Sequence, residues 1–320
     1  MHGTESPRPR SLYGDMLRTT LGFAALGIVW IGSTFLLAWL IRSFAPFLIE
    51  APWINTALNT VPLYGIALPV LLLICGSVPK TPIPKHRLSF AEFTLLFAPM
   101  FTFVIIGSLM GNLVTTVMDL LPFFDTGGTV DSMLSGGDLL WASVSVLIVA
   151  PIMEEIVFRK TLIPRLLVLG EIPAILVSGL FFGLFHMNFE QFFYAFFLGV
   201  IFGWIFVKTG KLIYTVLLHL VVNLFAGIVP TLLALLVEGS LTYAGANIGT
   251  LLLLSYSLAQ YVAAGLGILV ICLFCREIFR SVRRSPYPLG AQVRLLYANP
   301  GTIVMVAFCS LMFLINMLSF

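Results

Sequence analysis

Long runs of apolar residues, separated by short polar segments, dominate this chain. The first run covers residues 19–41, and the others cover 56–78, 92–118, 139–166, 172–187, 190–207, 211–237, 247–275 and 301–320. A helix of roughly 20 residues spans the hydrocarbon core of a bilayer, and only 172–187 and 190–207 are short for a crossing. The pattern predicts an all-α fold, a polytopic transmembrane helical bundle of about eight or nine helices.

The composition also indicates an integral membrane protein. Hydrophobic residues make up 59% of the chain and charged residues only 10%, whereas roughly 25% of the residues in soluble domains are charged. The net charge of +3 is small, and the basic residues lie in short loops between apolar runs, so nucleic acid is not an expected partner. The first run is not followed by an A-x-A-like cleavage site, which predicts an uncleaved first helix.

The basic residues predict which side of the membrane each loop faces, because Lys and Arg are enriched in cytoplasmic loops. With a cytoplasmic N-terminus and a crossing at each run, all but one of the 17 Lys and Arg residues fall on the cytoplasmic side, and only Arg42 falls outside. We therefore expect the N-terminus in the cytoplasm. The loop from 119 to 138 on the opposite face has no Lys or Arg, and we expect a solvated acidic loop from its aspartates, Asp119, Asp125, Asp131 and Asp138.

Small residues in the apolar runs predict packing rather than chemistry. Two pairs of glycines have the G-x-x-x-G spacing of closely packed membrane helices, namely Gly107 with Gly111 and Gly199 with Gly203. The four cysteines lie in or at the edges of apolar runs, where we expect small apolar fillers rather than disulfides. They are Cys75, Cys272, Cys275 and Cys309.

The first candidates for chemistry are charged residues that follow an apolar run. Glu154, Glu155 and Arg159 come directly after the apolar residues 141–153. A carboxylate near the bilayer centre costs about 2.5 to 3.5 kcal/mol on insertion scales, so an intramembrane acid is a functional candidate that needs partners or a water-filled cavity. Glu155 and Arg159 are four residues apart, which allows an ion pair on one helix face. Glu154 lies about 100° around the helix and is left to face another partner.

Polar residues in two later runs are predicted at a similar depth. His186 follows an apolar run, and His219 and Asn223 share one helix face at a spacing of four. Counted from the cytoplasmic ends at about 1.5 Å per residue, these residues and Glu154 lie about 12 to 20 Å into the membrane. Taken singly, a histidine of this kind is more often a packed residue, and Asn223 would be a bond between helices. Together they predict one intramembrane site.

Three ordered motifs resemble those of a known family. On successive apolar runs, the motifs are Glu154-Glu155-x-x-x-Arg159, Phe182-x-x-x-His186 and His219-x-x-x-Asn223. This trio resembles the CPBP family of intramembrane proteases, which includes the type II CAAX prenyl endopeptidases and bacterial proteins linked to bacteriocin processing, self-immunity and peptide-signal maturation. The resemblance covers residues 139–227, without a departure at the motif positions.

The resemblance implies an endopeptidase that activates water with a glutamate. Glu154 would be the catalytic base and His186 would hold or polarise the water. His219 and Asn223 would donate hydrogen bonds to the oxyanion of the tetrahedral intermediate. His186, His219 and Glu154 are also a possible zinc ligand set, but no H-E-x-x-H motif occurs, and we favour a mechanism without a cofactor.

The resemblance also implies supporting residues and divides the chain. Arg159 would fix Glu155 and its helix, and Phe182 would support the second motif. The expected parts are a cytoplasmic tail at 1–18, N-terminal membrane helices at 19–137, a catalytic core at 138–237 and C-terminal membrane helices at 238–320. A proline-rich segment, Val78–Pro84, predicts a cytoplasmic linker within the N-terminal part.

Two other classes of protein remain alternatives. An ion-coupled transporter would also place Glu, His and Arg at mid-depth, although no repeated halves are seen in the sequence. A non-catalytic membrane scaffold or immunity protein would keep the fold without the activity. For a protease, we expect a hydrophobic or lipidated peptide or protein as the substrate and the bilayer as the environment. The short loops are compatible with a prokaryotic plasma-membrane protein whose site lies nearer the cytoplasm.

Overall fold

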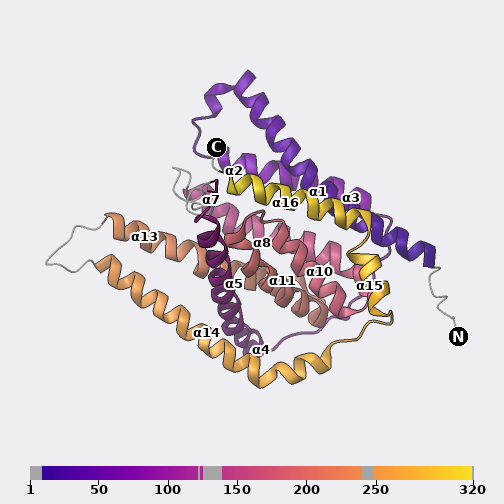
Figure 1. The fold of residues 1–320 in the computed structure, drawn as a ribbon. Helices are drawn as coiled ribbons and strands as arrows, with labels where there is room; N and C mark the ends of the chain where they lie inside the picture. Colours follow the sequence, from indigo (N-terminus) through magenta and orange to yellow (C-terminus); the bar gives the residue numbers. More distant parts are fainter. Residues whose placement is uncertain (1–8, 122, 125–138, 240–247, 319–320) are drawn as a thin grey trace.

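The chain folds into a bundle of long helices, and this computed structural model describes residues 9–121, 123–124, 139–239 and 248–318 (Figure 1). No β-strand occurs in those residues. The predicted all-α, polytopic transmembrane bundle is therefore confirmed. Eight helices in the described residues are long and apolar enough to cross a membrane, namely Leu12–Phe44, Ile54–Cys75, Phe90–Met118, Leu139–Leu169, Phe189–Thr209, Leu212–Val237, Ile248–Glu277 and Pro300–Met317.

The N-terminal half contains four of these crossings. The first is α1 (Pro9–Phe44), which is followed by the 3-10 turn η1 (Pro46–Leu48). The second joins α2 (Ile54–Thr60), η2 (Val61–Ala67) and α3 (Leu68–Cys75). The third joins α4 (Phe90–Leu95) and α5 (Phe97–Met118). The fourth joins α7 (Leu139–Val144), η3 (Ser145–Val149), α8 (Ala150–Glu154), η4 (Glu155–Leu162), α9 (Ile163–Leu166) and the 3-10 turn η5 (Leu167–Leu169).

The C-terminal half contains four more crossings and one shorter helix. The shorter helix is α10 (Glu171–Leu184), and the crossing that follows it is α11 (Phe189–Thr209). The next crossing joins α12 (Leu212–Val222), η6 (Asn223–Ile228) and α13 (Val229–Gly239). The last two crossings are α14 (Ile248–Ser281) and α16 (Pro300–Met317), with α15 (Leu289–Leu296) between them. Each of the longer predicted runs corresponds to one crossing.

The run predicted at 172–187 does not form a full crossing. Its helix, α10, has 14 residues, which cover about 21 Å at 1.5 Å per residue, whereas the hydrocarbon core is about 30 Å thick. The chain turns back through residues 185–188, and the side chain of Asn188 caps α11 by accepting a bond from the Gln191 N–H at 2.9 Å. At the other end of this hairpin, Lys208 Nζ lies 2.5 Å from Glu171 Oε2. Helices α10 and α11 therefore form a hairpin whose open ends meet at Glu171 and Lys208.

Several crossings contain π-helical segments, which are η2, η3, η4 and η6. In a π-helix each N–H bonds to the carbonyl five residues earlier, and proline has no N–H to donate. Pro230 follows η6 and so deprives the carbonyl of Phe225 of its π-helical donor. Gln260 Nε2 on α14 donates to that carbonyl at 2.7 Å. A side chain from another helix thus satisfies a main-chain group that water cannot reach inside a bilayer.

Glycines let α11 pack closely against α5. A Cβ atom at Gly107 would lie 2.3 Å from the Cα atom of Tyr194, and one at Gly111 would lie 2.6 Å from the carbonyl oxygen of Phe189. Both contacts are with backbone atoms, which have little freedom to move away. The predicted packing role of this glycine pair is confirmed.

The other side of α11 packs against α10 through a second set of glycines. A Cβ atom at Gly199 would lie 2.7 Å from the Cα atom of Gly179. At Gly203 the nearest atom would be Ile163 Cδ1 at 3.4 Å, which is an ordinary contact. Close packing is therefore confirmed at Gly199, whereas Gly203 faces a looser part of the interface. Helix α11 lies between α5 and α10 (Figure 1).

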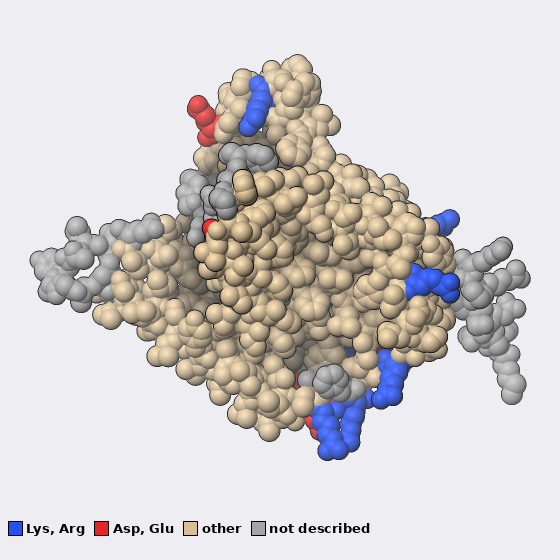
Figure 2. Space-filling model, in the orientation of Figure 1, with Lys and Arg blue, Asp and Glu red and all other residues tan. Residues whose placement is uncertain are grey.

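The predicted linker at Val78–Pro84 is not helical and is tied to the ends of two core helices. The Thr81 N–H donates to the carbonyl of Pro164 at 2.7 Å, and the His86 N–H donates to the carbonyl of Thr209 at 2.9 Å. Most of the Lys and Arg residues visible in Figure 2 gather at one end of the bundle, between the end of α14 and the start of α1. The assignment of this end to the cytoplasm stays a prediction.

Two minor predictions have mixed outcomes. Cys75 and Cys309 are buried, Cys275 is half-buried and Cys272 is exposed, and none of the four forms a disulfide. The apolar-filler interpretation is thus confirmed for the two buried cysteines. Of the aspartates in the predicted acidic loop, Asp125, Asp131 and Asp138 lie outside the described residues.

We expect Gly107→Ala to destabilise the bundle by about 1 to 3 kcal/mol, as overpacking of a tight contact does, because the added Cβ would meet the backbone of Tyr194. Titration with SDS, followed by circular dichroism in detergent micelles, measures the free energy of unfolding. Gly265→Ala on α14 is the matched control, because nothing lies within 4 Å of its Cβ position, and it should be neutral or slightly stabilising. Equal stability of Gly107→Ala and wild type would contradict this packing.

Candidate active site

One imidazole lies between the two adjacent carboxylates of the first motif. His219 Nδ1 lies 3.2 Å from Glu155 Oε1, and His219 Nε2 lies 3.7 Å from Glu154 Oε2. Glu155 is completely buried, whereas 21% of the Glu154 side chain is exposed. The π-helical register of η4 begins at Glu155, so the two carboxylates belong to different helical segments. Glu155 is thereby enclosed by protein, and Glu154 keeps access to a water molecule or a ligand.

Arg159 supplies the positive charge that Glu155 faces. Its Nε atom lies 3.2 Å from Glu155 Oε2, and both side chains are 0% exposed. The two atoms are within ion-pair distance, but the Nε–H group does not point at the carboxylate oxygen well enough for a hydrogen bond. Charge attraction therefore holds the pair. In a low-dielectric interior this attraction is large, and so is the cost of leaving either charge alone.

Three phenylalanine rings surround the Arg159 guanidinium. Its Cζ atom lies 4.5 Å from the centroid of Phe182, 5.3 Å from Phe202 and 6.0 Å from Phe158. A cation at the face of an aromatic ring is stabilised by the ring quadrupole, and more so where water is absent. Because these rings come from η4, α10 and α11, they tie the first motif to two other helices.

The ring of Phe182 also contacts both histidines of the site. Its ring centroid lies 5.0 Å from that of His186 and 5.7 Å from that of His219, in edge-on geometry in both cases. His186 Nδ1 lies 2.8 Å from the carbonyl oxygen of Phe182. A carbonyl only accepts, so Nδ1 carries the proton and Nε2 is left as an acceptor. His186 also lies close enough to Glu154 and His219 to interact with them electrostatically.

Asn223 bonds to a carbonyl of the fourth crossing. Its Nδ2 atom donates to the carbonyl of Val146 at 2.8 Å. Pro151 lies five residues after Val146 and has no N–H, so it deprives this carbonyl of a donor in the π-helix η3. Asn223 thus makes the hydrogen bond between helices that we expect from an asparagine with a packing role. This bond uses one of the two N–H groups of the amide.

The candidate site contains a residue that the sequence motifs missed. The hydroxyl of Tyr64 lies 3.5 Å from Glu154 Oε1, on η2 of the second crossing. Tyr64 stands in an apolar run far from the three motifs, and its only signal in the sequence is a phenolic hydroxyl within a predicted membrane helix. Glu154 therefore has Tyr64 on one oxygen and His219 on the other.

All four π-helical segments supply atoms to this site or to its support. Tyr64 lies in η2, Glu155 begins η4 and Asn223 begins η6, while η3 supplies the carbonyl that Asn223 binds. A π-helical turn widens the helix and redirects the side chains that follow it, and such turns often occur at functional sites. The bilayer-spanning helices therefore depart from regular α-helix where they meet one another around Glu154.

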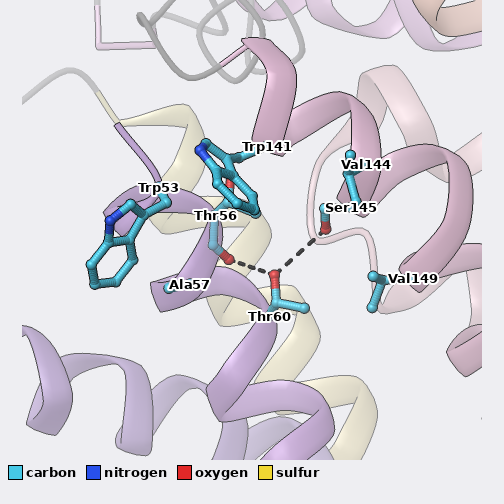
Figure 3. A pocket seen from close by; sticks show the side chains of 8 residues that line it. All are labelled: Trp53, Thr56, Ala57, Thr60, Trp141, Val144, Ser145 and Val149. Carbon is cyan, nitrogen blue, oxygen red and sulfur yellow. Dashed lines mark hydrogen bonds between the residues drawn. The ribbon is translucent and has the colours of Figure 1, made fainter. Parts of the chain in front are cut away.

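An apolar cavity of about 510 Å³ lies between α2 on one side and α7 and η3 on the other (Figure 3). Thr60 Oγ1 and Ser145 Oγ lie 3.5 Å apart across it. Thr60 is one helical turn before Tyr64, and Val149 is five residues before Glu154, so the same two helices lead from the cavity to the site. The lining residues are Trp53, Thr56, Ala57, Thr60, Trp141, Val144, Ser145 and Val149.

The possible zinc ligands do not gather as a ligand set. Among the described residues, no three His, Cys, Asp or Glu side chains are placed to hold a metal ion. Each candidate imidazole has Nδ1 held within the protein, His186 by Phe182 and His219 by Glu155, which leaves Nε2 as the nitrogen that could meet a metal. We derive no step of the reaction through a metal.

Comparison with known protein families points to the same segment. Residues 136–225 match the family described as Type II CAAX prenyl endopeptidase Rce1-like. The matched segment contains all three motifs, from Glu154 to Asn223. It does not contain Tyr64 or the lining residues of the cavity on α2. Neither a curated protein nor a solved structure matches the chain.

We expect Arg159→Met to destabilise the protein by about 3 to 5 kcal/mol, because it leaves Glu155 as an unpaired buried charge. The free energy of unfolding in SDS titrations measures the effect. The double variant Glu155→Gln/Arg159→Met should recover part of the loss, since both charges are then absent.

Arg283→Met is the matched control for this prediction. The Arg283 side chain is 82% exposed where it faces Glu171, so its loss should cost less than about 1 kcal/mol. A loss for Arg159→Met no larger than that of the control would show that the buried pair contributes little.

Proposed function

We propose that this chain, whose residues 136–225 match the Rce1-like family of type II CAAX prenyl endopeptidases, hydrolyses a peptide bond of a membrane-associated substrate with water activated by Glu154. It is an integral membrane protein, and the family that its central segment matches is one of proteases. The substrate class, the residue roles and the glutamate mechanism are our proposals.

One observation supports this function above the others. Glu154 is the only partly exposed member of the Glu154, Glu155 and His219 group, and the other two are sealed by Arg159 and the phenylalanine rings. A general base needs access to the proton that it removes, and its orientation needs support from groups that do not move. The arrangement supplies both.

The proposed reaction begins with a water molecule between Glu154 and the scissile carbonyl. His186 Nε2 is available as an acceptor and helps to hold this water. Glu154 removes one proton as the water oxygen bonds to the carbonyl carbon, which gives a tetrahedral oxyanion. The carbon–nitrogen bond then breaks, and Glu154 returns the proton to the leaving amine. The products are a carboxylic acid and an amine, and transfer of the acid proton to the amine gives a carboxylate and an ammonium group.

The oxyanion needs hydrogen-bond donors, and loss of one such donor typically lowers the rate by about 10² to 10³. We assign this role to the second N–H of the Asn223 amide and to Nε2 of His219 in its imidazolium form, because a neutral His219 that donates through Nδ1 to Glu155 has only an acceptor at Nε2. Glu155 holds His219 through Nδ1 at 3.2 Å, which fixes the direction in which Nε2 points. Arg159 and Phe182 hold Glu155 and the two imidazoles in turn.

The proposed substrate is a hydrophobic or lipidated peptide or protein. The cavity in Figure 3 is lined mainly by apolar and aromatic side chains, which favour an apolar ligand over a charged one. Because its two walls continue into Tyr64 and Glu154, an apolar segment bound there would place a neighbouring peptide bond near the base.

The decisive experiment compares membrane peptides from cells that express wild type or Glu154→Gln. We expect specific cleavage products to disappear, since loss of a general base typically lowers the rate by about 10² to 10⁴. Quantitative proteomics of the membrane fraction measures these products and names the substrates. Glu50→Gln, at an exposed position, is the control and should preserve them. Identical products in wild type and Glu154→Gln would reject the assigned base.

We expect Tyr64→Phe to lower kcat about 10- to 100-fold with little change in KM, because a hydrogen bond to a charged group contributes about 1.5 to 3 kcal/mol and Tyr64 orients the Glu154 carboxylate. Cleavage of a peptide identified by the proteomic comparison measures the change with the purified protein in lipid nanodiscs. Tyr261→Phe, on the exposed face of α14, is the matched control. Equal kcat values for the two variants would remove Tyr64 from the site.

A further inference from the structure

The turn that carries His186 has an unfavourable backbone conformation. Helix α10 ends at Leu184, and Met187 has a φ angle of +56°, the only positive φ of a non-glycine residue in the described chain. Glycine usually occupies such a position after a helix, because a Cβ atom disfavours it. A conformation of this kind persists only where the surroundings hold it, and it often marks a functional site.

Most of the polar groups of this turn find partners within the same hairpin. The Met187 N–H donates to the carbonyl of Leu184 at 3.1 Å. Asn188 Nδ2 donates to the carbonyl of His186 at 2.7 Å and to Gln191 Oε1 at 2.8 Å. The carbonyl of Met187 differs, because its donor comes from a helix more than a hundred residues away: Asn316 Nδ2 on α16 lies 2.9 Å from it.

Helix α16 is itself held firmly against the rest of the bundle. The ring of Phe313 packs on Phe189 and Phe192, with centroids 4.8 and 5.9 Å apart. At the other end of α16, Thr20 on α1 donates to Asn299 Oδ1 at 2.6 Å. Figure 1 shows α16 lying along α1. The amide of Asn316 is thus presented to the turn by a fixed element.

We propose that Asn316 is a positioning residue for His186. The bond from Asn316 satisfies the carbonyl of Met187, the residue that holds the left-handed conformation of the turn. It thereby stabilises the turn that directs His186 Nδ1 toward the Phe182 carbonyl and Nε2 toward the site. This inference rests on the proposed function for its effect on catalysis. It assigns a role to α16, which lies outside the segment that matches the protease family.

The test uses the full-length protein in lipid nanodiscs with ¹⁵N-labelled histidine. The imidazole signals of His186 and His219 are assigned from His186→Gln and His219→Gln. Asn316→Leu removes the donor at similar size, and we expect it to shift or broaden the His186 signals while those of His219 stay unchanged. On a peptide from the proteomic comparison, we expect kcat to fall about 10- to 100-fold at constant KM, as for a displaced catalytic group.

Two comparisons make the result specific. Asn316→Gln keeps a donor and should restore part of both readouts, whereas Leu314→Ala, at an exposed position of the same helix, should change neither. If Asn316→Leu does not fold, Asn316→Ser tests the same bond, because a serine hydroxyl is too short to reach the carbonyl. If folded Asn316→Leu or Asn316→Ser gave the same His186 imidazole signals as wild type, the proposal would be overturned. The spectra need no activity, so this outcome is distinct from a failure of the protease assignment.

Discussion

The candidate site depends on a buried positive charge that three aromatic rings and one carboxylate share. Arg159 is completely buried, and its guanidinium faces Glu155, Phe182 and Phe202. A charge in a low-dielectric interior is stable only when its partners are close and fixed. The same partners hold the catalytic candidates, since Glu155 binds His219 and Phe182 lies against both imidazoles. The contacts that stabilise the buried charge of Arg159 therefore also orient the side chains of the candidate site.

The bilayer imposes a second constraint, which is that main-chain groups must find partners without water. Prolines and π-helical turns interrupt the helices around the site, and side chains from other helices bind the carbonyls that these interruptions leave. The side-chain amides of Asn223 and Gln260 donate to the carbonyls of Val146 and Phe225 in this way. The amide of Asn316 donates to the carbonyl of Met187, which lies in the turn after α10. Irregular backbone is thus tolerated where neighbouring helices supply donors. These bonds also fix the relative positions of helices that are distant in the sequence.

The segment that matches the protease family contains the residues at the centre of the candidate site but not all of the residues around it. The matched residues 136–225 contain the acids, imidazoles and amide of the three motifs. The second crossing adds the Tyr64 hydroxyl and one wall of the apolar cavity, and the last crossing adds the Asn316 amide. Because the Tyr64 hydroxyl contacts Glu154 and the Asn316 amide contacts the turn that follows His186, we infer that these outer helices help to orient the side chains of the candidate site.

The sequence by itself determined the membrane-spanning fold and predicted the side chains of the candidate site that the three motifs contain. Apolar runs long enough to cross a bilayer have few alternatives to helix, and a spacing of four residues brings Glu155 next to Arg159 within a single helix. The sequence did not determine the length of α10, which ends where the chain turns at Met187, nor that Asn223 bonds to Val146. It also carried no sign of Tyr64 and Asn316 as neighbours of the site. Only the tertiary structure decided these points, because they depend on how separate helices pack, and local periodicity carries no information about contacts between residues far apart in the chain.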